Sequence, residues 1–164
     1  EIGLHPSYNT YQTPSAIAAE AKRLRAVAES EGIRQTEWGG RMHFLRWEHP
    51  TTVRAWDAAG MDYDSTLSYA DRPGFRCGTC FEYPAFDPVA QQMLKLRIRP
   101  LVAMECTVMA PRYMGLGTGE AAFAKFKQLK DTCRAVEGSY TLLWHNTQLE
   151  KADERQLYED VIKN

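Results

Sequence analysis

Apolar residues that recur at helical spacing predict four helices. The first helix covers residues 16–31, with Thr13 as N-cap, Pro14 at the first helical position and Gly32 as the stop. Three more helices are expected at residues 50–59, 118–136 and 151–162, the second of these capped by Thr118. The side chains expected to face inward include Ile17, Leu24, Val27, Ala28, Val53, Trp56, Phe126, Leu129, Leu157, Val161 and Ile162.

Shorter apolar runs between these helices predict strands. They lie at residues 61–67, 93–98, 101–108 and 140–144. The long segment 68–88 is rich in Gly, Pro and aromatic residues, so we expect an irregular loop, and a loop of this length in a compact domain is usually functional. Strands that alternate with helices favour a single α/β domain over residues 1–164 with parallel strands, in which chemistry collects at the carboxyl ends of the strands.

Composition narrows the class of partner. The chain has 164 residues, of which 44% are apolar and 25% charged, which is enough for one domain with a core. A net charge of −1 gives no reason to expect a nucleic-acid partner, and no run approaches the ~18 apolar residues of a membrane span. Four cysteines are too few for a disulfide-dense secreted scaffold and slightly favour a reducing, cytoplasmic compartment. Because the chain opens at Glu1 without Met or a signal segment, we expect the natural protein to continue upstream.

The histidines are the first candidates for chemistry. His5 follows a short apolar run, His145 follows the predicted strand 140–144, and His43 comes shortly after a glycine pair. No HxxxH or HExxH spacing links them, so spacing alone favours isolated histidines that are satisfied by backbone partners. The positions of His5 and His145 past strand ends favour the opposite view, because active sites of α/β folds gather there.

Four segments in order carry a resemblance to a known family. They are Glu-Ile-Gly-Leu-His-Pro-Ser at residues 1–7, the arginine of Arg-Met-His-Phe-Leu at 41–45, the acidic Glu105, and Leu-Trp-His at 143–145. In this order they resemble the polysaccharide deacetylase (NodB homology) family. Together with residues 63–67 and 74–80, they are similar to a bacterial subgroup of that family. The resemblance implies a distorted (β/α) barrel, which in this chain is incomplete at the N-terminus.

The resemblance implies a metal-dependent hydrolase that removes acetyl groups, most readily N-acetyl, from an amino sugar or polysaccharide. It implies a divalent metal, with zinc preferred, held by His5 and by a second histidine where this chain has Asn9. We expect His43 to fill that vacancy as ligand; the alternatives are a substrate contact and a structural role. The family's Asp pair, one base and one metal ligand, is absent, so an upstream segment of the same protein is expected to supply it, and this chain alone is expected to be inactive.

The resemblance also assigns roles around the leaving group. His145 corresponds to the general acid that protonates the amine as the C–N bond breaks. Such a histidine needs a carboxylate on its other nitrogen, and Glu105 is the candidate, with an exposed strand-edge Glu as the alternative. Arg41 would hold the base carboxylate through a charged hydrogen bond, unless it is an ordinary surface cation.

The 68–88 segment supplies the candidate substrate wall for a carbohydrate. Tyr69, Asp71 and Arg76 offer a stacking face and polar groups for a sugar ring, whereas the alternative is a covering loop with its own small core. Trp144 is either a sugar platform or a core residue, and core is favoured. Cys77 and Cys80 form a single CxxC, for which a structural role is favoured over a redox pair or a metal site.

Two rival functions remain open at this stage. One is a non-catalytic carbohydrate-binding derivative of the same barrel, which the Asn at position 9 and the missing Asp pair favour. The other is a redox protein built on the cysteine pair. The arrangement of His5, His43 and His145 opposes the first alternative, because a pure binding module needs no such trio, and thiol titration of Cys77 and Cys80 would test the second.

Overall fold

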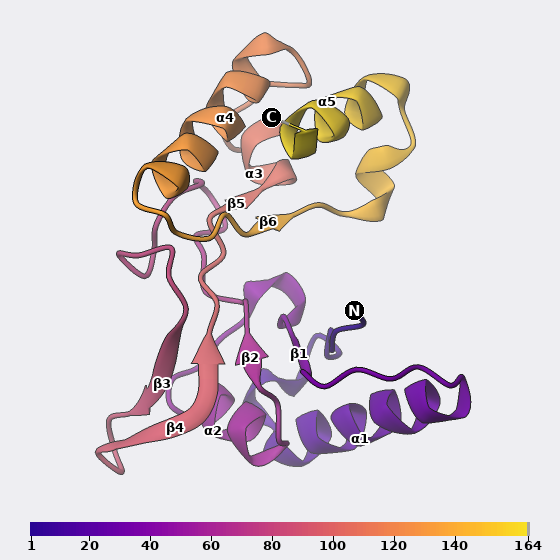
Figure 1. Ribbon diagram of the computed structural model, residues 1–164, viewed down its shortest axis with the longest axis vertical. Coiled ribbons are helices and arrows are strands. Elements are labelled where there is room, and N and C mark those ends of the chain that lie inside the picture. Colours follow the sequence, from indigo (N-terminus) through magenta and orange to yellow (C-terminus); the bar gives the residue numbers. More distant parts are fainter. Residues whose placement is uncertain (164) are drawn as a thin grey trace. The chain divides into compact units, whose positions relative to one another are not determined.

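A computed structural model describes residues 1–163, and its chain divides into two units (Figure 1). The first unit comprises Glu1–Leu67 and Glu82–Arg99, and the second comprises Ser68–Phe81 and Pro100–Asn164. Each unit has its own sheet and helices. The single domain expected over residues 1–164 stays a prediction.

A four-stranded sheet organises the first unit. Its order is β1 (Gly39–Gly40), β2 (Tyr63–Asp64), β4 (Gln92–Ile98) and β3 (Tyr83–Asp87). The β1–β2 and β2–β4 pairs are parallel, and β3 runs antiparallel to β4. Leu4 adds a parallel bridge to Gly40, where an added Cβ would lie 1.9 Å from the Leu4 carbonyl oxygen. Only glycine allows this approach, which brings the segment after Leu4 beside the segment after β1.

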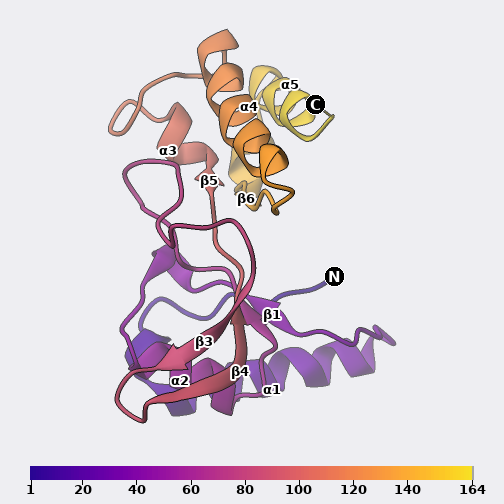
Figure 2. The same cartoon turned by 60° about the vertical axis from the view of Figure 1, so that its left-hand side comes forward.

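Two helices support this sheet. The helix α1 (Pro14–Ser30) begins with Thr13 as N-cap, as predicted. The helix α2 (Thr51–Ala58) packs against both α1 and β4 (Figure 2). The short 3₁₀ turn η1 (Thr10–Gln12) precedes α1 in the chain, and η2 (His43–Leu45) precedes α2. Trp56 and Val53 are buried as expected. The inward position expected for Val27 is wrong, because the buried stripe of α1 is narrow and leaves this side chain 52% exposed.

The second unit joins a two-stranded parallel sheet to three helices. The strands are β5 (Ala103–Met104) and β6 (Leu142–Leu143), and the helices are α3 (Glu105–Met109), α4 (Glu120–Ala135) and α5 (Ala152–Lys163), with η3 (Asn146–Leu149) before α5. The helices α4 and α5 pack side by side (Figures 1 and 2). Phe126, Leu129, Leu157 and Val161 form their shared core, as predicted. Ile162 was expected to face inward and is 50% exposed, because Val161 already takes the inward position of that turn.

Two strand predictions are corrected by the structure. The run 101–108 was expected to be one strand, but β5 ends at Met104 and the chain turns at once into α3. A continuous apolar run is compatible with either a buried strand or a buried helix, and here both halves are buried. The segment 68–88 was expected to be irregular, yet it contains β3, which pairs with β4 as an edge strand.

The structure is therefore mixed α/β, with parallel pairing at three of its four strand pairs. A closed barrel stays a prediction. Within residues 1–163, none of the helices combines the length and apolar character needed to cross a bilayer.

Candidate functional site

The strand register of the second unit brings Glu105 and His145 together. Met104 pairs with Leu143 at the ends of β5 and β6, so the residues that follow both strands emerge at the same edge. The Nδ1–H of His145 donates to Glu105 Oε1 at 2.5 Å, across forty positions of sequence. This is the contact that the sequence analysis expected for an orienting carboxylate, although the catalytic role itself stays a prediction.

Glu105 is an unusual carboxylate. Its side chain has no exposed surface, and its second oxygen, Oε2, has no hydrogen-bond partner in the described part of the chain. The His145 side chain is 49% exposed, so the dyad joins a buried acid to a ring that solvent can reach. A buried carboxylate oxygen without a partner costs free energy, which makes it an acceptor for an external donor or cation.

Cys106 joins this dyad, and the sequence analysis missed it. Ligand atoms of Glu105, Cys106 and His145 lie within 4.8 Å of one another, and among residues 1–163 they form the group of three that could hold a metal ion. Burial, and then the charge of Glu105, raise the pKa of the Cys106 thiol, and Arg112 opposes them. The sequence signal was a Glu-Cys pair at the end of a buried run, which was overlooked because Cys106 has no CxxC partner.

In the first unit, the structure brings His5 and His43 together. The Leu4–Gly40 bridge aligns His5 with the chain beyond β1, and the Nδ1–H of His5 donates to the carbonyl oxygen of Arg41 at 2.8 Å. His43 lies in η2, and its ring centroid is 4.9 Å from that of His5. A histidine that binds metal commonly donates its other ring N–H to a backbone carbonyl, as His5 does here.

The donor set fits two of the three ligands that the family resemblance implies. Two imidazoles on one tetrahedral zinc, at Zn–N distances of about 2 Å, have ring centroids about 5 Å apart. The His5–His43 separation of 4.9 Å agrees with that spacing. Within residues 1–163, no Asp, Glu or Cys completes a three-ligand cluster with this pair. Their ligation of a metal stays a prediction.

Asn9 is engaged elsewhere. Its Oδ1 accepts a hydrogen bond from Arg46 at 3.2 Å, and the Arg46 guanidinium lies over the rings of Tyr8 and Tyr11, at 4.1 and 4.0 Å from their centroids. The amide at the position of the family's second histidine thus has a structural partner. His43 is the second imidazole beside His5.

Arg41 lies beside a buried acid that the sequence analysis did not assign. Arg41 Nε donates to the Ser65 carbonyl at 2.9 Å, and its positive charge lies near Asp64. Asp64 is fully buried, and burial raises its pKa to about 7 against the opposing effects of its Thr66 hydrogen bonds and of Arg41. Its sequence signal was an acid inside an apolar strand. The predicted role of Arg41, to hold a base carboxylate, stays a prediction.

An exposed aromatic surface adjoins His43 and was also missed. Phe44 is 73% exposed, and its ring lies 5.0 Å from that of His43 and 5.4 Å from that of Tyr8. Phe44 and Leu45 have positive φ angles of 56° and 53°, which L residues adopt at a cost. Exposed aromatic faces of this kind can stack on sugar rings, and Phe44 and Tyr8 present such faces beside the imidazole pair.

The expected substrate residues of the 68–81 segment occupy varied environments within the second unit. Tyr69 and Asp71 are exposed, and Arg72 contacts both of them. Arg76 donates to the Ser68 carbonyl at 2.7 Å, so its guanidinium braces its own loop. Their contact with a carbohydrate stays a prediction.

Trp144 lies in a core environment. Its ring packs against Phe126 and Tyr158, at centroid distances of 5.6 and 5.2 Å, and its Nε1–H donates to the Gln148 carbonyl at 2.9 Å. These contacts match the core alternative, which the sequence analysis favoured for this residue over a sugar platform.

The four cysteines are free thiols. Cys80 is buried beside Cys133, and burial together with Cys80 raises the pKa of the Cys133 thiol to about 12. Gly138 closes over this pair, since an added Cβ would lie 2.2 Å from Cys80 Sγ. Cys80 therefore packs against Cys133 in the core of the second unit, which agrees with a structural role.

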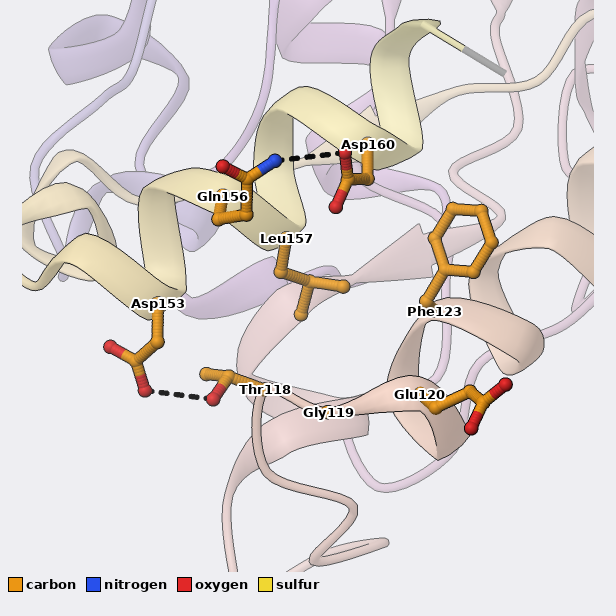
Figure 3. Close-up of a pocket in the computed structure, with 8 residues that line it drawn as sticks. All are labelled: Thr118, Gly119, Glu120, Phe123, Asp153, Gln156, Leu157 and Asp160. Carbon is orange, nitrogen blue, oxygen red and sulfur yellow. Dashed lines mark hydrogen bonds between the residues drawn. The ribbon is translucent and has the colours of Figure 1, made fainter.

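A surface pocket of about 280 Å³ lies between the start of α4 and α5 (Figure 3). Glu120, Asp153 and Asp160 make its lining acidic, and none of the predicted site residues lines it. Thr118 was expected to cap α4, but its hydroxyl donates to Asp153 at 2.8 Å and Gly119 takes the N-cap position. Acidic lining without a further polar anchor gives no reason to assign this pocket a ligand.

Comparison with family models, with curated proteins and with solved structures finds no match for this chain.

Proposed function

We propose that this chain belongs to a metal-dependent hydrolase that removes acetyl groups, N-acetyl in particular, from an amino sugar or polysaccharide. The observation that carries the proposal is the 2.5 Å hydrogen bond between His145 and Glu105. The family resemblance requires a carboxylate behind the general acid, and these two residues follow the paired strands β5 and β6 with their side chains in contact.

The dyad suits proton donation to a leaving amine. Glu105 is buried and fixed by its position at the start of α3, so it accepts the Nδ1–H of His145 and orients the ring. The other ring nitrogen, Nε2, is the proton donor in this proposal. Because the ring is 49% exposed, a large substrate can reach it. A positioned general acid of this kind contributes roughly 10²–10⁴-fold to rate.

The imidazole pair supports the metal half of the proposal. His5 and His43 have the ring spacing of two zinc ligands, and His5 has the backbone hydrogen bond typical of a ligating histidine. A divalent metal, zinc preferred, supplies an activated water and polarises the amide carbonyl when it is bound. The proposal includes an upstream segment of the same protein, whose aspartate pair would provide the base and the third ligand. Arg41 would hold that base.

The substrate proposed is a carbohydrate rather than a nucleic acid. Phe44 and Tyr8 provide exposed aromatic faces beside His43, and apolar sugar faces stack on such rings. The net charge of −1 gives no general attraction for a polyanion.

Acetate release from an N-acetylated chito-oligosaccharide tests the proposal, with the protein that includes its upstream segment. Metal content is measured in parallel by elemental analysis, and about one equivalent that depends on His5 and His43 is expected. His5→Ala and His43→Ala should each lower both metal content and activity. His145→Ala should keep the metal of the His5–His43 pair and lower kcat by roughly 10²-fold or more. His49→Ala, at the fourth and exposed histidine, is the matched control and should change neither.

Each arm of this experiment can contradict the proposal. Retention of full activity by His145→Ala would remove the general acid. Metal loss in His5→Ala alone would move His43 to the substrate side. An intact protein that binds the oligosaccharide but holds no metal would favour the second candidate, a non-catalytic carbohydrate-binding derivative. That candidate has its own support in the exposed Phe44 and in the engagement of Asn9 by Arg46.

A further inference from the structure

We propose that Glu105, Cys106 and His145 form a second metal site, specific for a thiophilic divalent cation such as Zn²⁺ or Co²⁺. The three residues offer one carboxylate oxygen, one sulfur and one imidazole nitrogen within 4.8 Å of one another. Its donors differ from those of the His5–His43 pair, which are nitrogens alone, and the site does not depend on the proposed hydrolysis.

The unpartnered oxygen of Glu105 is the independent observation that points to a ligand. Glu105 Oε2 is completely buried and has no hydrogen-bond partner within residues 1–163, while Oε1 is engaged by His145. Buried carboxylate oxygens are almost always paired with a donor or a cation. A divalent ion that replaces the proton between His145 and Oε1 and also contacts Oε2 would supply the missing partner and balance the buried charge.

The geometry needs only a small adjustment to bind an ion. Ligand atoms around a tetrahedral zinc lie roughly 3.3–3.8 Å apart, given metal–ligand distances of about 2.0–2.3 Å. The present 2.5 Å separation of His145 Nδ1 and Glu105 Oε1 would therefore widen by about 1 Å, with the ion in place of the shared proton. His145 can move, because it is half exposed and precedes the short η3 turn. Glu105 can remain fixed.

The donor chemistry selects the cation. A thiolate, an imidazole and a carboxylate suit Zn²⁺ and Co²⁺, whereas Mg²⁺ and Ca²⁺ prefer oxygen ligands alone. Cys106 lies half-buried next to Glu105, and a cation bound between its sulfur and that carboxylate would replace the thiol proton. Three protein ligands leave the fourth position of a tetrahedral zinc open to water, as in zinc sites with three protein ligands generally.

Cobalt spectroscopy of the chelator-treated, reduced protein tests this site directly. Titration with Co²⁺ should produce a thiolate-to-cobalt charge-transfer band in the near ultraviolet. Cys106→Ser should abolish the band, and Glu105→Gln and His145→Ala should weaken Co²⁺ binding by roughly tenfold or more, since each removes one ligand. Cys77→Ser, a half-buried cysteine of the same unit, is the matched control and should leave the band unchanged.

The result that overturns the site is equally direct. A spectrum without the band, a band that survives Cys106→Ser, or a band that Cys77→Ser removes would each exclude the proposed ligand set. If Cys106→Ser does not fold, alkylation of the unaltered protein replaces it. Zn²⁺ should then protect Cys106 from iodoacetamide, as seen by peptide mass spectrometry, and leave Cys77 reactive; equal labelling of Cys106 with and without Zn²⁺ would refute the proposal.

One consequence rests on the proposed function. A cation at this site takes the Nδ1 of His145 away from Glu105, so excess Zn²⁺ should inhibit acetate release, and Cys106→Ser should relieve that inhibition without loss of the first metal. The two proposals fail separately: a protein without hydrolytic activity can still give the cobalt band, and an active protein can lack it.

Discussion

The Thr66 hydroxyl donates a 2.6 Å hydrogen bond to Asp64 at a point where neither side chain has any exposed surface. The Thr66 backbone N–H also donates to the same carboxylate, at 2.8 Å. Burial nevertheless dominates, and the pKa of Asp64 rises to about 7. The first unit therefore contains an acid that changes charge near neutral pH.

Replacement of Asp64 by Asn should remove a pH dependence of stability. Because the folded-state pKa is above the unfolded value of 3.8, the folded state binds the proton more tightly, and stability falls as pH rises from about 4 to about 7. The shift corresponds to a penalty of about 4 kcal/mol, fully present above about pH 7. Urea unfolding of both proteins at about pH 5 and about pH 8 measures this penalty. The free energy of unfolding of Asp64→Asn, relative to that of the unaltered chain, should be larger at the higher pH. A difference between the two proteins that is the same at both pH values would mean that Asp64 titrates normally.

Loss of the Thr66 hydroxyl should lower the free energy of unfolding by more than its small volume suggests. It donates to Asp64 and accepts the backbone N–H of Met42 at 2.9 Å, so Thr66→Val leaves two buried groups unpaired in an almost identical volume. The expected loss in the free energy of unfolding is about 2–3 kcal/mol. Thr66→Ser keeps the hydroxyl and should lose only about 1 kcal/mol, from its missing methyl group. Equal unfolding midpoints for the two variants would show that packing, not hydrogen bonding, holds this position.

The helices could be predicted from sequence more fully than the strands. α1, for example, begins at its Thr13–Pro14 signal, because capping and proline geometry act locally. The strand β3 carries Pro84 and a register shift against β4, and its existence depends on a partner strand rather than on its own pattern. The helix α3 was hidden inside an apolar run, where the burial of nearly all side chains erases the difference between helical and strand periodicity.

Asp87 should stabilise the first unit at neutral pH and lose that effect in acid. Arg54 binds its carboxylate through Nε at 2.5 Å and Nη2 at 2.8 Å, and the backbone N–H groups of Val89 and Ala90 donate to Oδ1. The Arg54 hydrogen bond, first among these, lowers the pKa of Asp87 to about 2. Since the folded-state pKa is depressed, the stabilisation is present above about pH 4 and declines as pH falls toward about 2.

Asp87→Asn should therefore unfold at lower urea concentration than the unaltered chain at about pH 6, and the gap should narrow at about pH 3. Asp71→Asn is the control, because Asp71 forms a solvent-exposed pair with the adjacent Arg72, and such pairs contribute little. A gap of constant size from neutral to acid pH would assign the effect to the turn geometry instead of the ion pair.

The candidate site could be predicted where one motif implied one partner. Glu105 and His145 meet because the two strands before them are in parallel register, which the order of strands made foreseeable. Cys106 and Phe44 could not be found that way. Cys106 lies close to the Glu105–His145 pair because the chain turns into α3 at Glu105. Phe44 projects from the surface because its backbone is left-handed.

Phe44 is a residue for which stability and binding should change in opposite directions. Its φ of 56° is unfavourable for an aromatic residue, and its ring is 73% exposed, so it contributes little burial. Phe44→Asn introduces a side chain that tolerates left-handed backbone, and the free energy of unfolding should rise by about 0.5–1 kcal/mol. If Phe44 is kept despite its unfavourable backbone because its ring stacks on sugar, the same change should weaken binding of a chito-oligosaccharide by roughly tenfold.

Phe86→Asn separates a specific effect from the general loss of an exposed ring. Phe86 is 46% exposed on β3 and is not among the residues with positive φ, so this substitution should lower stability slightly and leave sugar binding unchanged. Urea unfolding and isothermal titration calorimetry on both variants give the comparison. If Phe44→Asn is less stable than the unaltered chain, packing with Tyr8 and His43 holds the left-handed Phe44. If Phe44→Asn binds the oligosaccharide as tightly as the unaltered chain, the aromatic surface beside the imidazole pair has no part in sugar recognition.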